Sequence, residues 1–188
     1  MDNTQLLALF PTPVLLIDNF ISDNERLDLI NHIKTLDYHL HGSLSINSRS
    51  TFRGDNECAL SEEIANRIQE QIDNFLEILG ISSAKLDNSW VNVQGKGSQL
   101  LTHMHPNSKV SGSLYLNVDE NSSKLYFYNP NPHNKFQYHV DETHFNYDFI
   151  YIKPKNCQLV LFPSWLEHGS NGEINNTEDR TVISFNSN

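Results

Sequence analysis

The chain has 188 residues with 23 acidic against 13 basic side chains, and the formal net charge of −10 disfavours nucleic acid or an anionic membrane as a partner, because both need a basic face. Hydrophobic residues make up 38% of the chain, too many for a disordered protein, yet no apolar run reaches membrane-spanning length. Two cysteines exclude a disulfide scaffold and a four-thiolate metal site, so any metal would be held by oxygen and by some of the nine histidines.

The N-terminal third is predicted to mix strand and helix. The apolar run 13–17 begins with a proline and is typical of a first or edge strand. Ser22 or Asp23 can cap a helix. That helix would direct four apolar side chains toward the core: Leu27, Ile30, Ile33 and Leu36. From Tyr38 to Asn56 the sequence is polar and irregular, and we expect a loop with short strands.

A second helix is predicted after Ser61, which we expect to be its N-cap. Glu62 and Glu63 lie in the first turn, where a negative charge interacts favourably with the helix dipole. The apolar residues that recur at helical spacing are Ile64, Ile68, Ile72, Phe75, Leu76 and Leu79. Gly80 stands where helices commonly end in a left-handed glycine.

Beyond Gly80 the pattern changes to short strands separated by turns. The predicted strands are 90–94, 99–103, 109–117, 124–128, 149–152, 158–162 and 181–185. About seven strands after two helices predict an α+β protein that is mainly β, a sandwich or jelly-roll-like barrel with the N-terminal helices packed on one side. No linker or repeat divides the chain, so we expect one domain, 1–188, in which 1–88 supports a β core of 89–188.

Three histidines in the β region form the main candidate site. Residues i and i+2 of a strand face the same way, so His103 and His105 can direct both imidazoles into one cavity. His168 follows an apolar strand and could add a third imidazole, which would give a facial metal site with positions open for substrate or O₂. The alternative is that His103 and His105 are partly exposed strand residues without a metal.

Arg180 lies 12 residues after the third histidine and begins the last predicted strand. In a strand, Arg180, Val182 and Ser184 share a face. An inward-facing arginine is costly unless it meets an anion, and a guanidinium with a serine hydroxyl on the same face suits a carboxylate. The alternative is an edge-strand arginine paired with Asp179 or Glu178.

The order His-x-His, distal His and Arg-x-x-x-Ser resembles the Fe(II)/2-oxoglutarate-dependent oxygenase superfamily. More narrowly, it is similar to a branch of oxygenases frequent in marine bacteria and their phages. The matching stretches are Phe10–Val14, Trp90–Val93, His103–Ser108, Ser111–Leu116, Phe162–His168 and Arg180–Asn186. They run from Phe10 to the C-terminus and are densest after Trp90, and their combination makes the resemblance specific.

The resemblance implies a double-stranded β-helix, a distorted jelly roll related to cupins, that uses Fe(II), 2-oxoglutarate and O₂. Arg180 would pair with the distal carboxylate of 2-oxoglutarate, and Ser184 could hydrogen-bond the same carboxylate. Asn92 and Tyr115 would face the barrel interior, where they could contact the cosubstrate or only satisfy hydrogen bonds of the core. The implied reaction is a hydroxylation with release of succinate and CO₂.

At the metal, this chain departs from the superfamily, because position 105 is histidine where the broad pattern has Asp or Glu. His-x-His is the ordinary form in the narrower branch, so we interpret His103, His105 and His168 as the ligands. Three neutral imidazoles leave Fe(II) at a formal charge of +2, and the dianionic cosubstrate then brings the complex to 0 rather than −1. Such a site also admits Zn or Ni readily. Alternatively, only His103 and His168 bind, and water or a distant carboxylate takes the third position.

The substrate is not indicated by these motifs, and a protein side chain and a small metabolite both fit. Two other functions stay open: a cupin-like three-histidine metalloenzyme that does not use 2-oxoglutarate, and a non-catalytic jelly-roll binding or structural module. Arg180 with Ser184 argues against the first, since such an enzyme does not require them. No secretory signal is visible, so we expect a cytoplasmic location in a bacterium or a phage-infected host.

Other conspicuous residues have simpler interpretations. Trp165 is expected to pack rather than to form a substrate platform. The polar segment between Tyr128 and Phe149 is long enough to form a lid. The histidines of that segment, which we expect to be exposed to solvent, are His133, His139 and His144. The residues that we interpret as helix-end or loop histidines and as structural thiols are His32, His39, His41, Cys58 and Cys157.

Overall fold

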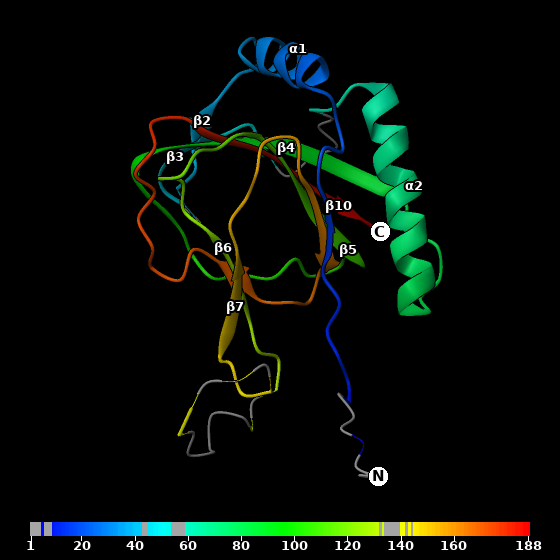
Figure 1. The fold of residues 1–188 in the computed structure, drawn as a ribbon. Helices are drawn as coiled ribbons and strands as arrows, with labels where there is room; N and C mark the ends of the chain where they lie inside the picture. The colour runs from blue at the N-terminus through cyan, green and yellow to red at the C-terminus, as the bar shows by residue number, and fades with distance from the viewer. Residues whose placement is uncertain are drawn as a thin grey trace.

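The computed structural model describes residues 5, 9–42, 45–53, 59–131, 133, 140–141, 143 and 145–188. In this part of the chain, two antiparallel sheets face each other, and two helices pack on the outer side of the larger sheet (Figure 1). Within the same described residues, no helix is long and apolar enough to cross a membrane.

The larger sheet has the strand order β1-β8-β5-β10-β4-β3-β2. Its strands are β1 (Leu15–Ile17), β2 (His39–Leu40), β3 (Ser45–Ser50), β4 (Leu86–Leu100), β5 (Val110–Asn117), β8 (Leu159–Pro163) and β10 (Arg180–Ser187). The C-terminal strand β10 lies between β4 and β5 and is antiparallel to both. This placement of sequence-distant strands side by side is that of a jelly roll.

The smaller sheet has the order β7-β6-β9. Its strands are β6 (Leu125–Tyr128), β7 (Phe149–Ile152) and β9 (His168–Gly169). Next to β9, His103 forms an isolated β-bridge with His168. The His103 N–H donates to the His168 carbonyl (3.0 Å), and the His168 N–H donates to the His103 carbonyl (3.1 Å). The segment between β4 and β5 is thereby attached to the smaller sheet.

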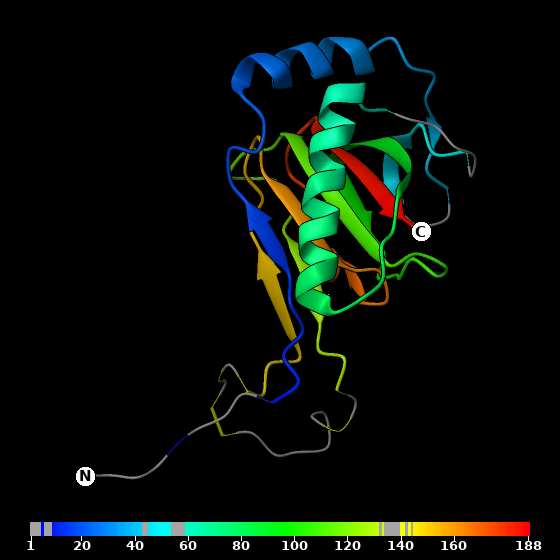
Figure 2. The same cartoon turned by 90° about the vertical axis from the view of Figure 1, so that its right-hand side faces the viewer.

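Two helices precede most of the strands. Helix α1 (Asp23–Ile33) begins in a capping box, in which the Ser22 hydroxyl accepts from the Glu25 N–H and the Glu25 carboxylate accepts from the Ser22 N–H. Helix α2 (Glu62–Leu79) is the longer one. Figure 2 shows α2 lying across the strands of the larger sheet, with α1 beyond one end of it.

The apolar helix patterns are largely confirmed. Ser61 caps α2 and Gly80 ends it with a φ of 64°, while its predicted apolar side chains are buried or partly buried. In α1 the prediction for Leu27 is wrong, because Leu27 is 49% exposed and Leu29 is buried in its place. Two residues correspond to about 200° around a helix, which turns Leu27 away from the face that packs.

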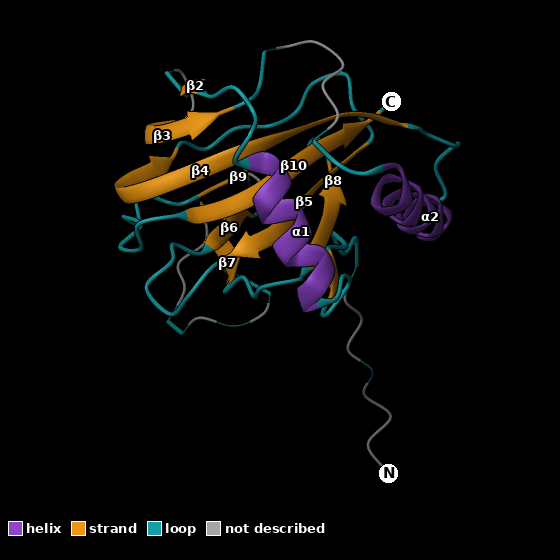
Figure 3. Ribbon diagram, turned by 90° about the horizontal axis from the view of Figure 1, so that it is seen from above, coloured by secondary structure: helices purple, strands orange, loops and turns teal. Residues whose placement is uncertain are grey.

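Alternation along the central strands separates two cores. The outer core, which packs against the helices, includes Val91, Val110, Leu114, Leu161, Ile183 and Phe185. The core between the sheets is smaller and includes Tyr115, Leu125, Phe127, Val160, Phe162 and Val182. Figure 3 shows α2 and the strands β6 and β7 on opposite sides of β5 and β10. The sheet therefore separates a helix-covered face from an inner face.

The predicted strands 90–94 and 99–103 are one continuous strand, β4, of 15 residues. Gly97, which favours a turn in the sequence, has a φ of 84° and accommodates a register shift in the pairing with β3. The expectation that His103 and His105 share a strand is wrong, because β4 ends at Leu100 and only the single bridge of His103 follows before β5.

Candidate metal and cosubstrate site

The inner faces of β4, β10 and β5 form the floor of a cavity of about 380 Å³. Cross-strand pairing arranges the floor in rows: Arg180 with Gln94, Val182 with Asn92 and Tyr115, Ser184 with Trp90 and Ser113, and Asn186 with Asn88 and Ser111. All of the residues predicted from the sequence to form the site line this one cavity: Asn92, His103, His105, Tyr115, His168, Arg180 and Ser184.

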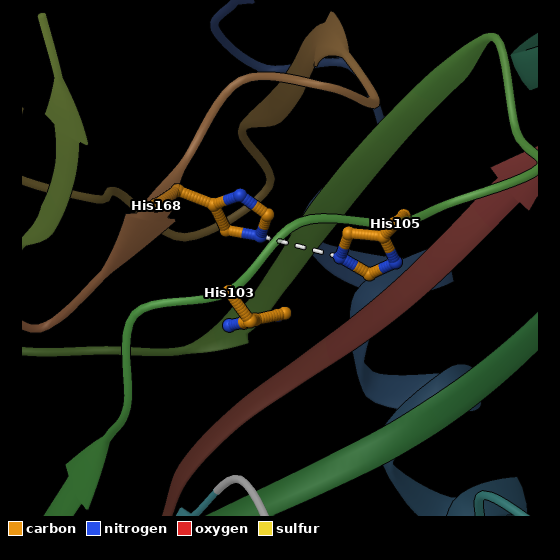
Figure 4. A group of neighbouring side chains, drawn as sticks. All are labelled: His103, His105 and His168. Atoms are coloured by element: carbon orange, nitrogen blue, oxygen red, sulfur yellow. Dashed lines mark hydrogen bonds between the residues drawn. The ribbon is translucent and has the colours of Figure 1, made fainter. Parts of the chain in front are cut away.

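The three predicted histidines lie together opposite this floor. One ring nitrogen from each of His103, His105 and His168 lies within 4.8 Å of the other two. Figure 4 shows the rings converging from two segments, the loop that leads to β5 and the start of β9. The histidines are therefore brought together by the β-bridge between His103 and His168, and not by a strand that His103 and His105 share.

Two of the rings are held by carbonyls two residues earlier in the chain. Nδ1 of His103 lies 2.8 Å from the Leu101 oxygen, and Nδ1 of His168 lies 2.9 Å from the Leu166 oxygen. A carbonyl can only accept, so each Nδ1 carries the proton and each Nε2 presents a lone pair. Nδ1 of His105 has no such partner among the described residues.

Burial keeps the cluster neutral. It lowers the pKa of His105 to about 4, with a smaller contribution from the nearby His103. Burial also lowers the pKa of His103, and that of His168 falls well below its ordinary value. Neutral imidazole is the form that ligates a metal.

The nitrogen positions fit a single divalent ion. Nε2 of His105 and Nε2 of His168 are 3.3 Å apart. Two nitrogens that each lie about 2.1 Å from one ion, at octahedral to tetrahedral angles, are about 3.0 to 3.4 Å apart. Imidazole ligands suit Fe, Ni and Zn, and carbonyl partners on the second ring nitrogen are the usual support of metal-binding histidines.

Arg180 lies at one end of the floor and is 4% exposed. Its Nε donates to the Ser123 carbonyl (3.2 Å), one of its terminal nitrogens donates to the Gln94 side-chain oxygen, and its Cζ lies 5.3 Å from the centre of the Tyr115 ring. No carboxylate of the described residues pairs with it. Burial lowers its pKa, while Tyr115 and, from beyond ion-pair distance, the carboxylate of Glu173 raise it. An arginine stays charged, so a cation without a directly paired anion faces this part of the cavity.

The central place of β10 in the sheet excludes the alternative of an edge-strand arginine. Ser184 shares the face of Arg180, but four residues of strand separate their Cα atoms by about 13 Å. The Ser184 hydroxyl instead accepts from the Asn92 side-chain amide (3.2 Å) and lies in the row of Trp90. The Trp90 ring is 6.0 Å from the His105 ring, so the strand register places Ser184 nearer to the histidine cluster than to Arg180.

Some residues that line the cavity were not predicted from the sequence. Trp90 and Gln94 are on the same strand face as Asn92, and this period-two relation could have identified them. His41 also lines the cavity, and burial lowers its pKa. No local signal could have identified His41, because it reaches the cavity only through the pairing of β2 with β3 and of β3 with β4.

Other predictions have mixed outcomes. Trp165 is 52% exposed, so its interpretation as a packing residue is wrong: it follows β8 in a turn outside the sandwich. Cys157 is buried, as expected of a structural thiol. His32, His39 and His133 are exposed. Predictions that fall outside the described residues are those for Cys58, His139, His144 and most of the expected lid.

Similar folds occur in solved structures of 2-oxoglutarate oxygenases. A 2OG-Fe(II) oxygenase family oxidoreductase from Burkholderia pseudomallei is 10% identical with a TM-score of 0.67, over 93% of this chain and 83% of that one. HygX from Streptomyces hygroscopicus, with nickel and 2-oxoglutarate bound, is 12% identical with a TM-score of 0.64, over 94% and 82%. A viral collagen prolyl hydroxylase from Paramecium bursaria Chlorella virus-1 is 18% identical with a TM-score of 0.59, over 93% and 94%. The fold is thus the double-stranded β-helix of this class of oxygenases.

The sequence matches the family described as "Putative 2OG-Fe(II) oxygenase" over residues 88–186, which is 99 of the 188 residues. The chain therefore belongs to this family, whose cofactors are Fe(II), 2-oxoglutarate and O₂. No curated protein sequence matches it significantly. The resemblance to the superfamily is confirmed, and these comparisons do not bear on its marine and phage branch.

Proposed function

We propose that this chain is a dioxygenase that hydroxylates a C–H group of its substrate while 2-oxoglutarate and O₂ are converted to succinate and CO₂. One observation carries the proposal: three inward imidazole nitrogens and a buried arginine without an anionic partner line the same cavity. The first group fits the metal of the family, and the second fits a carboxylate of its cosubstrate.

His103, His105 and His168 would hold the Fe(II). When bound, the metal with its cosubstrate supplies O₂ activation coupled to oxidative decarboxylation. The protein's own contribution is to fix the rings and to bury them, His168 fully and the other two in part. The Leu101 and Leu166 carbonyls fix two rings in the ligating tautomer, and the Phe162 ring packs 4.6 Å from His168.

Arg180 would bind the distal carboxylate of 2-oxoglutarate. The hydrogen-bond partners of its guanidinium are neutral, and Glu173 acts on it only from beyond ion-pair distance, so a carboxylate of the cosubstrate could pair with it directly. Tyr115 and Asn92 flank Val182 in the next row toward the histidines, where they could contact the middle of the molecule. Burial raises the pKa of Tyr115, so its hydroxyl is a neutral donor at pH 7.

We also propose that residues 1–188 act as one domain. Strands β1 and β3 from the N-terminal region pair directly with β8 and β4 of the matched region, β2 pairs with β3, and both helices pack on the same sheet. The role of 1–88 would be to support the core of 89–188 that carries the chemistry.

The test is aerobic incubation with Fe(II) and 2-oxoglutarate, with succinate measured in the absence of an added substrate. We expect slow uncoupled succinate formation that requires both additions and is abolished by His168→Ala and by Arg180→Met. Exposed His133→Ala serves as the matched control and should form succinate at the parent rate.

The two alternatives predict different results. Metal binding with an O₂-dependent activity that ignores 2-oxoglutarate would favour the cupin-like enzyme. A protein that contains no metal and is not stabilised by added Fe(II) or Mn(II) would favour a non-catalytic module. The buried Arg180 supports the 2-oxoglutarate-dependent dioxygenase over both alternatives, since neither of them needs a buried cation at this place.

A further inference from the structure

A buried hydrogen-bond chain crosses the floor beyond Ser184 and is not used by the proposed function. The Ser164 and Ser111 hydroxyl oxygens are 2.8 Å apart, and the Ser111 hydroxyl donates to the Asn186 side-chain oxygen (2.8 Å). The exposed fractions are 0%, 1% and 9% for Ser164, Ser111 and Asn186. Because its oxygen accepts from Ser111, the Asn186 amide is fixed with its NH₂ group as a donor that has no acceptor among the described residues, and Asn186 lines the cavity.

The same chain leads to His105. The Ser164 carbonyl accepts from the His105 backbone N–H (2.9 Å), so one serine positions both His105 and, through Ser111, the amide of Asn186. Nε2 of His105 points at His168, and Figure 4 shows its second ring nitrogen turned away from the other two rings. With Nε2 as the metal ligand, Nδ1 carries the proton and is a second donor without an acceptor among the described residues.

A cosubstrate held by Arg180 does not account for the Asn186 donor. Asn186 is six residues from Arg180, about 20 Å along an extended strand, which is far more than the five carbons of 2-oxoglutarate can span. Two unused donors line the same cavity, one on a ligating histidine and the other six residues along β10 from Arg180, and together they point to a second ligand.

We infer that Nδ1–H of His105 and the NH₂ group of Asn186 bind an acceptor oxygen of the primary substrate, a carbonyl or a carboxylate. This inference rests on the proposed function. It also gives a role to the departure at position 105: a carboxylate there would offer only acceptors and add a negative charge, whereas histidine offers a donor and leaves the metal complex with its cosubstrate neutral. Ser111 is a positioning residue in this arrangement.

The experiment uses the protein loaded with Zn(II), which is diamagnetic, and saturated with 2-oxoglutarate. Acetate, acetamide and methylamine are titrated as probes, and NMR follows the Asn186 side-chain NH₂ and the His105 ring N–H. We expect shifts with acetate or acetamide and none with methylamine, which has no acceptor oxygen. A stronger response to acetate identifies a carboxylate, and a stronger response to acetamide identifies a neutral carbonyl. No response to either, or an equal response to methylamine, overturns the inference.

Variants separate this site from the metal site. Asn186→Asp keeps the shape but replaces the donor by an acceptor, and we expect probe binding to weaken at least tenfold. Asn74→Asp makes the same change on the exposed face of α2 and should bind the probe like the parent. The His105→Asp variant should still bind Zn(II) and 2-oxoglutarate but should no longer bind the probe. Ser111→Ala should lower the affinity for the probe and broaden the Asn186 NH₂ signals. Ser111→Thr retains the hydroxyl, so its probe affinity and signal widths should match those of the parent.

The outcomes also separate this inference from the proposed function. A parent protein that binds neither Zn(II) nor 2-oxoglutarate would contradict the proposed function and the inference with it. If both bind but probe affinity is unchanged in Asn186→Asp and His105→Asp, only the inference is overturned.

Discussion

The two faces of β10 differ in what they give the protein. On the outer face, Ile183 and Phe185 are fully buried in the core that packs against the helices. On the inner face of the same strand, Arg180, Ser184 and Asn186 line the cavity. Adjacent residues of one strand thus belong alternately to a core that stabilises the fold and to a site that binds ligands.

The inner face is also where polar groups are left without partners. Among the described residues, three buried side-chain oxygens have no hydrogen-bond partner, and two of them, those of Asn88 and Asn92, lie on the floor, while the third is that of Ser98. A buried acceptor costs about 1–3 kcal/mol when neither the protein nor a molecule in the cavity donates to it. The apolar packing on the outer face must therefore offset the free-energy cost of burying polar groups on the inner face. Substitutions on the inner face should mainly affect ligand binding, and substitutions on the outer face should mainly affect stability.

The largest expected effect is on the inner face at the metal. His168→Ala should weaken Mn(II) or Zn(II) binding at least about 100-fold. Even the loss of a group that only hydrogen-bonds to a metal ligand lowers metal affinity by about 10- to 100-fold. Isothermal titration calorimetry at pH 7 measures this, with His133→Ala as the control. Equal affinities in the two variants would contradict the assignment of the cluster.

The next effect is at the other end of the floor. Arg180→Met should weaken 2-oxoglutarate binding to the Mn(II) form about 100-fold, because a charge-assisted pair in a buried site is lost. The free energy of unfolding without ligands should change little, because removal of a buried cation offsets the loss of its hydrogen bonds to Ser123 and Gln94. Exposed Arg49→Met is the matched control. A variant that unfolds more easily but binds 2-oxoglutarate normally would refute this role.

On the outer face the effect should appear in stability. A Cβ at Gly112 would lie 2.3 Å from Cζ of Phe185 and 2.7 Å from the Val160 carbonyl oxygen, so Gly112→Ala overpacks the core. We expect a loss of about 1–3 kcal/mol in urea unfolding. Gly42→Ala, where no heavy atom lies within 4 Å of the new Cβ, should change little. Identical unfolding curves for the two variants would count against this packing.

The smallest effect concerns the helix layer and depends on pH. The pKa of Glu25 is lowered to about 2 by hydrogen bonds from the Ser22 hydroxyl and N–H, and then by Arg67. A carboxylate whose pKa is lower in the folded state stabilises the fold fully above its ordinary pKa of 4.5, and this contribution is lost as the pH falls through 2.

Glu25→Gln should therefore cost about 1 kcal/mol at pH 7 and progressively less toward pH 2. Urea unfolding at several pH values measures the difference, and exposed Glu70→Gln on α2 is the control. A cost that stays constant down to pH 2 would show that the charge of Glu25 is not the cause.

Local sequence signals predicted much of this molecule because they act over a few residues. Ser61 and Gly80 bound α2, and the alternation around Val182 and Ile183 separates the cavity face from the helix face. The residue types of the site, three imidazoles and one arginine in a characteristic order, were also evident without coordinates.

Tertiary structure decided how these residues meet. His103 and His105 do not share a strand, and the cluster exists because a backbone bridge attaches His103 to His168, 65 residues later. Arg180 is buried because β10 is inserted between β4 and β5. The same pairing brings Asn186 beside Ser111 and carries His41 to the cavity. Non-local hydrogen bonds leave no period in the sequence, so the composition of the site was predictable while its geometry and its unused donors were not.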